Sequence, residues 1–329
     1  MSESVPAGLD EFLTEAGWAG ANIEPLPGDA SFRRYFRIRN GTRSAMLMDA
    51  PPPHEDPRPF LHVGKWLREH GLRAPAIYAE RPERGWVLIE DFGADRMRDW
   101  LDANPAAEGT VYAKAIDALV ALHACPPGPF EPYDMAIYQR EAALFVEWFC
   151  PLQGLKVDEA GWIAAWNGVL VPMLPRQQPG VTVLRDYHAE NIMLLGESKE
   201  EGEQGLIDFQ DALVGHPAYD LVSLLQDARR DVPPELERAM LEHYLGQVDA
   251  GPDFEADYAR LGAQRNAKIV GIFARLWKRD GKPRYLAMIP RVWEAMERDL
   301  KHPALAPVAE WFAANVPQEL RDTGGGELQ

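Results

Sequence analysis

The chain has 329 residues, which favours about two domains, and 46% of them are hydrophobic, enough for a substantial core. It carries 34 Lys and Arg against 51 Asp and Glu, a net charge of −17. This acidic balance opposes binding to nucleic acid and to anionic membrane surfaces, so neither is an expected partner.

The amino-terminal segment MSESVPAGLDEFL has neither the basic nor the apolar stretch of a leader peptide. No apolar run approaches the roughly 20 residues that span a bilayer. Cys125 and Cys150 are the only cysteines, which suits two thiols in a reducing compartment. These features together predict a soluble, cytoplasmic protein.

The first ninety residues contain the short alternating runs that are typical of a small β-sheet. SFRRYFRIR and RSAMLMDAP flank an Asn-Gly pair at 40–41, which predicts a β-hairpin. Asp56 as N-cap and the apolar spacing after it predict a helix over 57–70. Further strands are expected over 76–79 and 86–89.

From residue 95 onward, apolar residues recur with the period of an α-helix. One interruption, over 181–211, contains three strand-like pieces, VTVL, NIMLL and GLID. Helices are expected over 110–125, 137–150, 159–174, 234–247, 255–280, 290–300 and 305–315.

These elements predict an α+β chain with a small β-rich N-lobe and a larger, mainly helical C-lobe. We assign 1–91 to the N-lobe, 92–322 to the C-lobe and 323–329 to a disordered tail. This outline is typical of a bilobal, protein-kinase-like fold, although a fold alone does not establish a function.

The segment LRDYHAENIMLL, residues 184–195, brings polar side chains directly before an apolar strand. A hairpin between NIMLL and GLID would place Asn191, before the first strand, close to Asp208, at the end of the second. Asp186 lies five residues before Asn191. An amide and a carboxylate suit Mg²⁺, and a second carboxylate can orient an attacking hydroxyl, which is the division of roles in phosphoryl transfer.

This pattern resembles a family of kinases. Asp186 and Asn191 match the catalytic loop H-R-D-x-x-x-x-N, and LIDFQ is similar to the metal-binding I-D-F/W of the aminoglycoside phosphotransferase and choline kinase-like superfamily. GHPAYDLVSLL, Gly215 to Leu225, resembles the next element of that superfamily, where a buried Asp, here Asp220, lies beneath the catalytic loop.

A narrower resemblance extends from about Gly28 to Val308. DASFRRYFRI, MDAPP, LIEDFG, IFARLWKRDGK and HPALAPV are similar to segments of the bacterial anomeric N-acetylmuramate/N-acetylglucosamine kinases. The resemblance implies ATP and Mg²⁺ as cofactors, phosphorylation of an amino sugar at C1, and a role in peptidoglycan recycling. We expect a monomer whose partners are ATP and the small-molecule acceptor.

The resemblance assigns roles to particular side chains. Asp186 would be the catalytic base, and His188 would touch the transferred phosphate or the acceptor unless it is a buried structural histidine. Asn191 and Asp208 would hold Mg²⁺, and Asp220 would accept hydrogen bonds from backbone N–H groups of the loop. The residues expected near the nucleotide are Ser31, Phe32, Arg33, Arg34, Glu90 and Phe92, and those expected near the acceptor are Glu141, Trp148, Glu190 and Arg279.

Three of the residues expected near the acceptor could instead have a purely structural role. Packing in the core is the alternative for Glu141 and Trp148, which lie seven residues apart on one helix side. A solvated helix end is the alternative for Arg279, which belongs to a basic cluster with Arg275 and Lys278. That cluster could otherwise face an acidic acceptor such as the lactyl carboxylate of N-acetylmuramate.

Two departures from the kinase pattern affect the nucleotide side. GDASFRR has one glycine instead of G-x-G-x-x-G, and the strand SAMLMDA has no lysine. Met48 or a neighbour occupies the place of that lysine. Arg33, Arg34 or a second Mg²⁺ would therefore have to offset the phosphate charge.

Two other functions stay open at this point. A kinase of a cationic acceptor, such as an aminoglycoside, choline or ethanolamine, would suit the net charge of −17. A catalytically inactive kinase-like scaffold is the second alternative, and the missing lysine is its only support.

Overall fold

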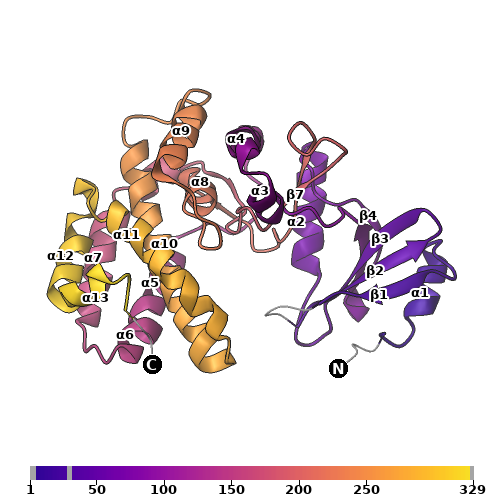
Figure 1. Ribbon diagram of the computed structural model, residues 1–329, viewed down its shortest axis with the longest axis horizontal. Helices are drawn as coiled ribbons and strands as arrows, with labels where there is room; N and C mark the ends of the chain where they lie inside the picture. Colours follow the sequence, from indigo (N-terminus) through magenta and orange to yellow (C-terminus); the bar gives the residue numbers. More distant parts are fainter. Residues whose placement is uncertain (1–4, 28–31, 327–329) are drawn as a thin grey trace. The chain divides into compact units, whose positions relative to one another are not determined.

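The computed structural model describes residues 5–27 and 32–326, and Figure 1 shows its helices and strands. It divides into two compact units. The sheet unit comprises the described residues up to Met97 together with Asn191–Asp211. The helical unit comprises Arg98–Glu190 and the described residues from Ala212 onward. The sequence predicts segment 191–211 in the helical lobe, but this segment groups with the sheet.

The sheet unit is built on an antiparallel sheet with the strand order β1-β2-β3-β5-β4. The hairpin predicted around 40–41 is confirmed, because β2 and β3 pair from Arg34 opposite Asp49 to Asn40 opposite Arg43. The strands are β1 (Asn22–Pro25), β2 (Arg34–Asn40), β3 (Arg43–Asp49), β4 (Ile77–Arg81) and β5 (Trp86–Glu90).

One side of this sheet is buried against helix α1 (Leu9–Glu15). Phe36 and Ile38 of β2 have no exposed surface and belong to the same apolar cluster as Leu9 and Phe12 of α1. The alternation of side chains along a strand directs every second residue of β2 into this cluster. The sequence does not predict α1 or β1, because such short apolar runs have no distinctive period.

Helix α2 (Arg58–Glu69) confirms the helix predicted over 57–70. The Asp56 carboxylate accepts a hydrogen bond of 3.0 Å from the backbone N–H of Arg58. The N-cap residue is Pro57 rather than Asp56, so the carboxylate satisfies the first turn from one position further out.

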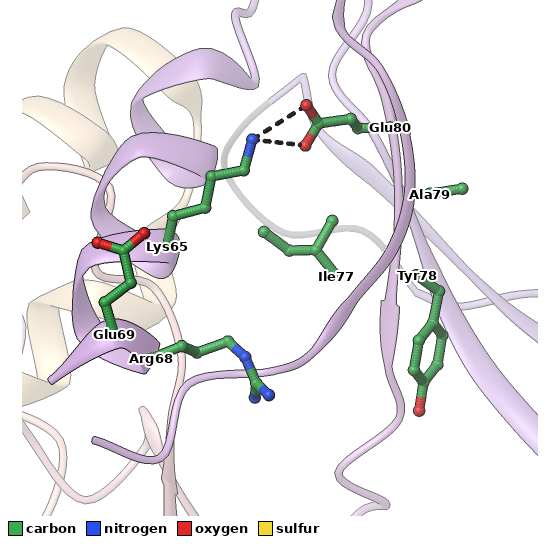
Figure 2. Close-up of a pocket in the computed structure, with 7 residues that line it drawn as sticks. All are labelled: Lys65, Arg68, Glu69, Ile77, Tyr78, Ala79 and Glu80. Carbon is green, nitrogen blue, oxygen red and sulfur yellow. Dashed lines mark hydrogen bonds and ion pairs between the residues drawn. The ribbon is translucent and has the colours of Figure 1, made fainter. Parts of the chain in front are cut away.

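A surface groove of about 460 Å³ lies between α2 and β4 (Figure 2). Figure 2 shows Lys65 of α2 reaching across to Glu80 of β4, with its Nζ 3.0 Å from the carboxylate. None of the residues expected near the nucleotide lines this groove. Its lining residues are Lys65, Arg68, Glu69, Ile77, Tyr78, Ala79 and Glu80.

The helical unit consists mainly of α-helices (Figure 1). The helix expected over 137–150 is divided into α5, a π-helical turn over Phe145–Phe149, and α6. The helices are α3 (Met97–Ala103), α4 (Glu108–Ala124), α5 (Met135–Leu144), α6 (Cys150–Leu152), α7 (Glu159–Leu170), α8 (Ala218–Leu225), α9 (Pro234–Leu245), α10 (Phe254–Asp280), α11 (Ile289–Asp299), α12 (Ala306–Asn315) and α13 (Gln318–Asp322).

An aromatic cluster holds the π-helical turn, α7, α11 and α12 together. Phe145 lies with its ring centroid 5.3 Å from those of Trp162 and Phe312 and 5.8 Å from that of Trp293. All four side chains are buried. Burial of such large rings is stabilising, and replacing one of them by Ala typically costs about 3–5 kcal/mol.

The end of the described chain differs from the disordered tail expected over 323–329. Residues 323–326 form turns in which Gly325 is buried against Trp293, and the Gly325 carbonyl accepts a hydrogen bond of 2.7 Å from Gln153. Gly325 has a φ of 93°, a conformation that glycine adopts without strain. Within residues 5–27 and 32–326, no helix is long and apolar enough to cross a membrane.

Candidate functional site

In the sheet unit, strands β7 (Ile192–Leu194) and β8 (Gln204–Leu206) form the hairpin that the sequence predicts. Asn191 directly precedes β7, and Asp208 lies two residues after β8. The Asn191 Nδ2 donates a hydrogen bond of 3.3 Å to Asp208 Oδ2. The backbone N–H of Ile207 also donates to the Asn191 carbonyl at 3.1 Å. The hairpin therefore brings together the two side chains expected to hold Mg²⁺.

Asp208 is held in an unusual conformation. Its φ of 60° lies in the left-handed region, which costs a non-glycine residue free energy and is typical of functional sites. Gln210 Nε2 donates a hydrogen bond of 2.9 Å to Asp208 Oδ1. Phe209 is fixed against α2, because it stacks on Phe60 at 4.9 Å and lies 3.3 Å from the position of a Cβ on Gly64. These contacts fix the direction of the Asp208 carboxylate.

A second group of charged and polar side chains in the sheet unit comprises Arg33, Tyr35 and Glu55. Arg33 Nε lies 3.1 Å from Glu55 Oε2, and both side chains are largely buried. Burial raises the pKa of Tyr35, while Arg33 lowers it and Asp208 and Glu55 raise it further. The Tyr35 hydroxyl therefore lies within electrostatic range of Arg33, Asp208 and Glu55. The sequence does not single out Tyr35 or Glu55.

Arg34, the neighbour of Arg33, has a different environment. Its Nε donates a hydrogen bond of 3.0 Å to Asp49 Oδ2, and Trp86 Nε1 donates to Asp49 Oδ1 at 3.1 Å. Asp49 is only 2% exposed. Arg34 thus compensates a buried carboxylate, because it lies directly opposite Asp49 in the β2–β3 pairing.

The remaining residues expected near the nucleotide have packing partners in the sheet unit. Glu90 accepts hydrogen bonds of 2.8 and 2.6 Å from Arg73. The Arg73 guanidinium also lies 4.6 Å from the ring centre of Phe92. Phe32 is 65% exposed and stacks on His54 at 4.9 Å. Ser31 lies outside the described residues.

Met48 or a neighbour is expected at the place of the kinase lysine. Met48 lies on β3 opposite Tyr35 of β2, and it is completely buried. A buried thioether cannot offset phosphate charge, so another cation, such as Arg33, would have to do so.

In the helical unit, hydrogen bonds to α8 hold the loop around Asp186 in place. The Asp220 carboxylate accepts hydrogen bonds from the backbone N–H groups of Leu184, at 2.6 Å, and Arg185, at 2.8 Å. Arg185 has a φ of 70°, a second left-handed residue in the region of the motif. Burial raises the pKa of Asp220 to about 7, against the opposing effect of these two N–H donors.

Asp186 is surrounded by basic side chains. Burial opposes its ionisation, but His188, Lys268, Arg265 and Arg229 together lower its pKa below the usual value. Lys268 and Arg265 belong to α10, which lies about eighty residues further along the chain, so local motifs do not reveal them. Asp186 is therefore an ionised hydrogen-bond acceptor at neutral pH.

Glu141 is expected near the acceptor, but its buried carboxylate contacts three other side chains of the protein. Its carboxylate lies 2.9 Å from Lys268 Nζ and also accepts hydrogen bonds from Tyr133 and Arg185. It is 6% exposed, and its pKa is lowered because Lys268 and Arg185 outweigh the effect of burial. Because its oxygens pair with Arg185 of the Asp186 loop and with Lys268 of α10, Glu141 connects this loop to α10.

His188 and Glu190 form part of the same loop scaffold. His188 Nε2 lies 3.2 Å from Arg229, and burial lowers the pKa of His188 to about 4. His188 is therefore neutral at pH 7. Glu190 forms ion pairs with Arg98 and, at 2.8 Å, with Arg229. These contacts match the structural alternative for His188.

The two other residues expected near the acceptor are Trp148, in the π-helical turn after α5, and Arg279, in the last turn of α10. Trp148 is partly buried in the π-helical turn. Arg279 is exposed at the end of α10 and pairs with Asp280 at 2.6 Å. Arg279 therefore matches the solvated helix end that was its alternative.

The donor set in the sheet unit fits Mg²⁺. Asn191 and Asp208 supply an amide and a carboxylate, the hard oxygen ligands that Mg²⁺ prefers alongside water and phosphate oxygens. Among the described residues, no group of three or more His, Cys, Asp and Glu could hold a metal ion.

Comparison with known proteins shows the family to which the chain belongs. Residues 22–262 match the family described as "Phosphotransferase enzyme family". A protein of Caulobacter vibrioides named N-acetylmuramate/N-acetylglucosamine kinase is 36% identical, with 98% of this chain and 99% of the relative covered. A protein of the same name from Pseudomonas aeruginosa is 38% identical over 94% of both chains.

Solved structures show the fold. A choline/ethanolamine kinase family protein from Mesorhizobium loti has a TM-score of 0.64 at 16% identity, covering 92% of this chain and 97% of that one. The ADP-bound aminoglycoside phosphotransferase APH(2'')-Ib has a TM-score of 0.61 at 15% identity, covering 89% and 97%. The predicted kinase-like α+β fold is thereby confirmed.

Proposed function

The chain belongs to the phosphotransferase enzyme family, and we propose that it transfers the γ-phosphoryl group of ATP to the anomeric hydroxyl of N-acetylmuramate and N-acetylglucosamine. It is an enzyme that phosphorylates a sugar hydroxyl. The observation that carries the choice of acceptor is the 36–38% identity, over nearly the whole chain, to relatives named for these two sugars. A place in peptidoglycan recycling follows from that acceptor.

In this proposal Asp186 acts on the acceptor. Its ionised carboxylate would accept a hydrogen bond from the anomeric hydroxyl, orient the oxygen toward the γ-phosphorus, and take up the proton as the new bond forms. Lys268 and Arg265 keep Asp186 ionised, because their charges lower its pKa. Asp220 holds the loop through the N–H groups of Leu184 and Arg185.

Asn191 and Asp208 would hold Mg²⁺, which supplies neutralisation of phosphate charge when bound. The left-handed φ of Asp208 and its hydrogen bond to Gln210 keep the carboxylate oriented in advance. Orientation before binding reduces the free energy lost in ordering the side chain.

Arg33 is the cation we assign to the nucleotide phosphates, in place of the missing lysine. Glu55 would position it, as a carboxylate that pairs with the guanidinium at 3.1 Å. Arg34 is not assigned this role, because its charge compensates the buried Asp49. Nucleotide use agrees with the ADP named in one structural neighbour and the ATP named in a second, the ternary complex of APH(2'')-IIa with streptomycin.

A kinase of cationic acceptors is the second candidate, because the net charge of −17 would attract such molecules. ADP release should be measured with saturating ATP and Mg²⁺ and with N-acetylglucosamine, N-acetylmuramate, glucosamine, choline or kanamycin. We expect turnover with the two N-acetylated sugars. Turnover with choline or kanamycin alone would support the second candidate, and no turnover with any acceptor would support an inactive scaffold.

A further inference from the structure

The two proposed acceptors differ in charge. N-acetylmuramate carries a lactyl carboxylate that N-acetylglucosamine lacks, so it is an anion at neutral pH. The protein has a net charge of −17, and its overall field opposes an anionic acceptor. A local cation is therefore needed if the enzyme is to accept both sugars comparably.

The long helix α10 presents positive side chains along one stripe. Lys268 and Arg275 are seven residues apart, which places them on the same face of the helix and about 10 Å apart along its axis. Lys268 is the member of the stripe that lies near the proposed catalytic base, because its charge lowers the pKa of Asp186. Arg275 lies two helical turns further along α10.

Packing defines where this stripe lies. A Cβ on Gly271, between the two cations, would be 2.3 Å from the backbone of Leu144, so α10 meets the end of α5 almost backbone to backbone. Lys268 forms an ion pair with Glu141 of α5. The carboxylate of Glu147, in the π-helical turn, raises the pKa of Arg275. The stripe therefore follows the boundary between α10 and the α5–π segment.

Among the described residues, Arg275 differs from Arg176 and Arg229 in making no ion pair within 4 Å. Arg176 and Arg229 each pair with a carboxylate, at 2.5 and 2.8 Å. In the part of the chain that the structure describes, Arg275 makes no hydrogen bond or ion pair, and its buried Nε has no acceptor. Burial and the neighbouring Arg279 lower the pKa of Arg275, and the carboxylates of Asp280 and Glu147 oppose this only in part. A partly desolvated guanidinium without a partner favours an anionic ligand.

The two neighbouring cations do not share this property. Arg279 is exposed and pairs with Asp280. Lys278 is exposed and lies 5.7 Å from the ring centre of Trp277. Arg275 is thus the member of the basic cluster at the end of α10 that is partly buried and makes no ion pair among the described residues.

We propose that Arg275 binds the lactyl carboxylate of N-acetylmuramate and thereby allows the enzyme to accept the anionic sugar as well as the neutral one. This inference rests on the proposed function. It predicts a specificity residue that contributes to one acceptor only, since N-acetylglucosamine offers Arg275 no carboxylate.

The test compares kcat/KM for both sugars in the wild-type enzyme and in Arg275→Gln. We expect kcat/KM for N-acetylmuramate to fall about 10- to 100-fold, the effect of losing one charge-assisted contact. The value for N-acetylglucosamine should change less than about twofold, which also shows that the variant is folded. Arg275→Lys, which keeps the charge, should recover part of the loss.

Arg279→Gln is the matched control, because it removes the same charge from the same helix end. It should leave the ratio of the two kcat/KM values unchanged. Equal losses for both sugars in Arg275→Gln, or the same discrimination in Arg279→Gln, would overturn the inference while leaving the proposed function intact. A wild-type enzyme that phosphorylates neither sugar would contradict the proposed function, and the inference with it.

Discussion

The side-chain amide of Asn191 lies 3.3 Å from the carboxylate of Asp208, although 17 positions separate them in the chain. The β7–β8 hairpin produces this approach, because Ile192 pairs with Leu206 and the next residues outward meet at its open end. The proposed Mg²⁺ ligands are therefore set by the register of one short hairpin. A change in that register would separate them.

Asp208→Asn should reduce kcat by about a thousandfold, because the variant loses the negative charge that the proposed metal ligand supplies. Initial rates at increasing Mg²⁺ concentrations measure this. Glu201→Gln is the control, since it removes a charge from the exposed connection between the same strands. A kcat within tenfold of wild type at saturating Mg²⁺ would contradict the assignment.

Asp186→Asn should lower kcat by about 10²- to 10⁴-fold, the usual contribution of a general base. The KM for ATP should change little, because Asp186 is assigned to the acceptor and not to the nucleotide. Steady-state kinetics with each substrate varied in turn separate the two effects. Wild-type kcat in this variant would remove Asp186 from the proposed mechanism.

Arg33→Gln should raise the KM for ATP about 10- to 100-fold, if Arg33 supplies the phosphate contact that lysine makes elsewhere. Glu55→Gln should produce a smaller change in the same direction, because Glu55 only positions the guanidinium. Arg34→Gln is the matched control. It should lower the melting temperature by leaving Asp49 buried and uncompensated, with the KM for ATP nearly unchanged. The reverse pattern for the two arginines would exchange their roles.

Stability should depend on pH through a buried histidine. Burial lowers the pKa of His188 to about 4, whereas histidine in the unfolded chain titrates near 6.5. Between these values the unfolded chain binds more protons, so the free energy of unfolding should fall as pH drops from about 7 to 4. His188→Asn should show a shallower decrease in urea unfolding at pH 5 and pH 7. An unchanged slope would show that other groups control this range.

The sequence predicts those parts of the site that depend on neighbouring residues. The β7–β8 hairpin is indicated by two apolar runs around a polar connection, and it places Asn191 beside Asp208. The β2–β3 hairpin and α2 are likewise indicated by local turn and spacing signals. Short elements such as α1 lack such a signal, because their stability comes from packing against the sheet.

The rest of the site depends on contacts between distant parts of the chain. Lys268 and Arg265 reach the surroundings of Asp186 from α10, and no local pattern connects them to the catalytic loop. Glu141 is typical of a helix surface by sequence, yet it is buried because the charges of Arg185 and Lys268 compensate it. Such roles follow from packing, which residue spacing does not encode.

The position of the transferred phosphate tests the proposed function most directly. Purified protein should be incubated with ATP, Mg²⁺ and N-acetylglucosamine, and the product examined by proton–phosphorus correlation NMR. We predict a correlation between the new phosphorus signal and the anomeric proton of the sugar. A phosphorus signal correlated with the protons at C6, or no phosphorylated sugar although choline or kanamycin is phosphorylated, would contradict it.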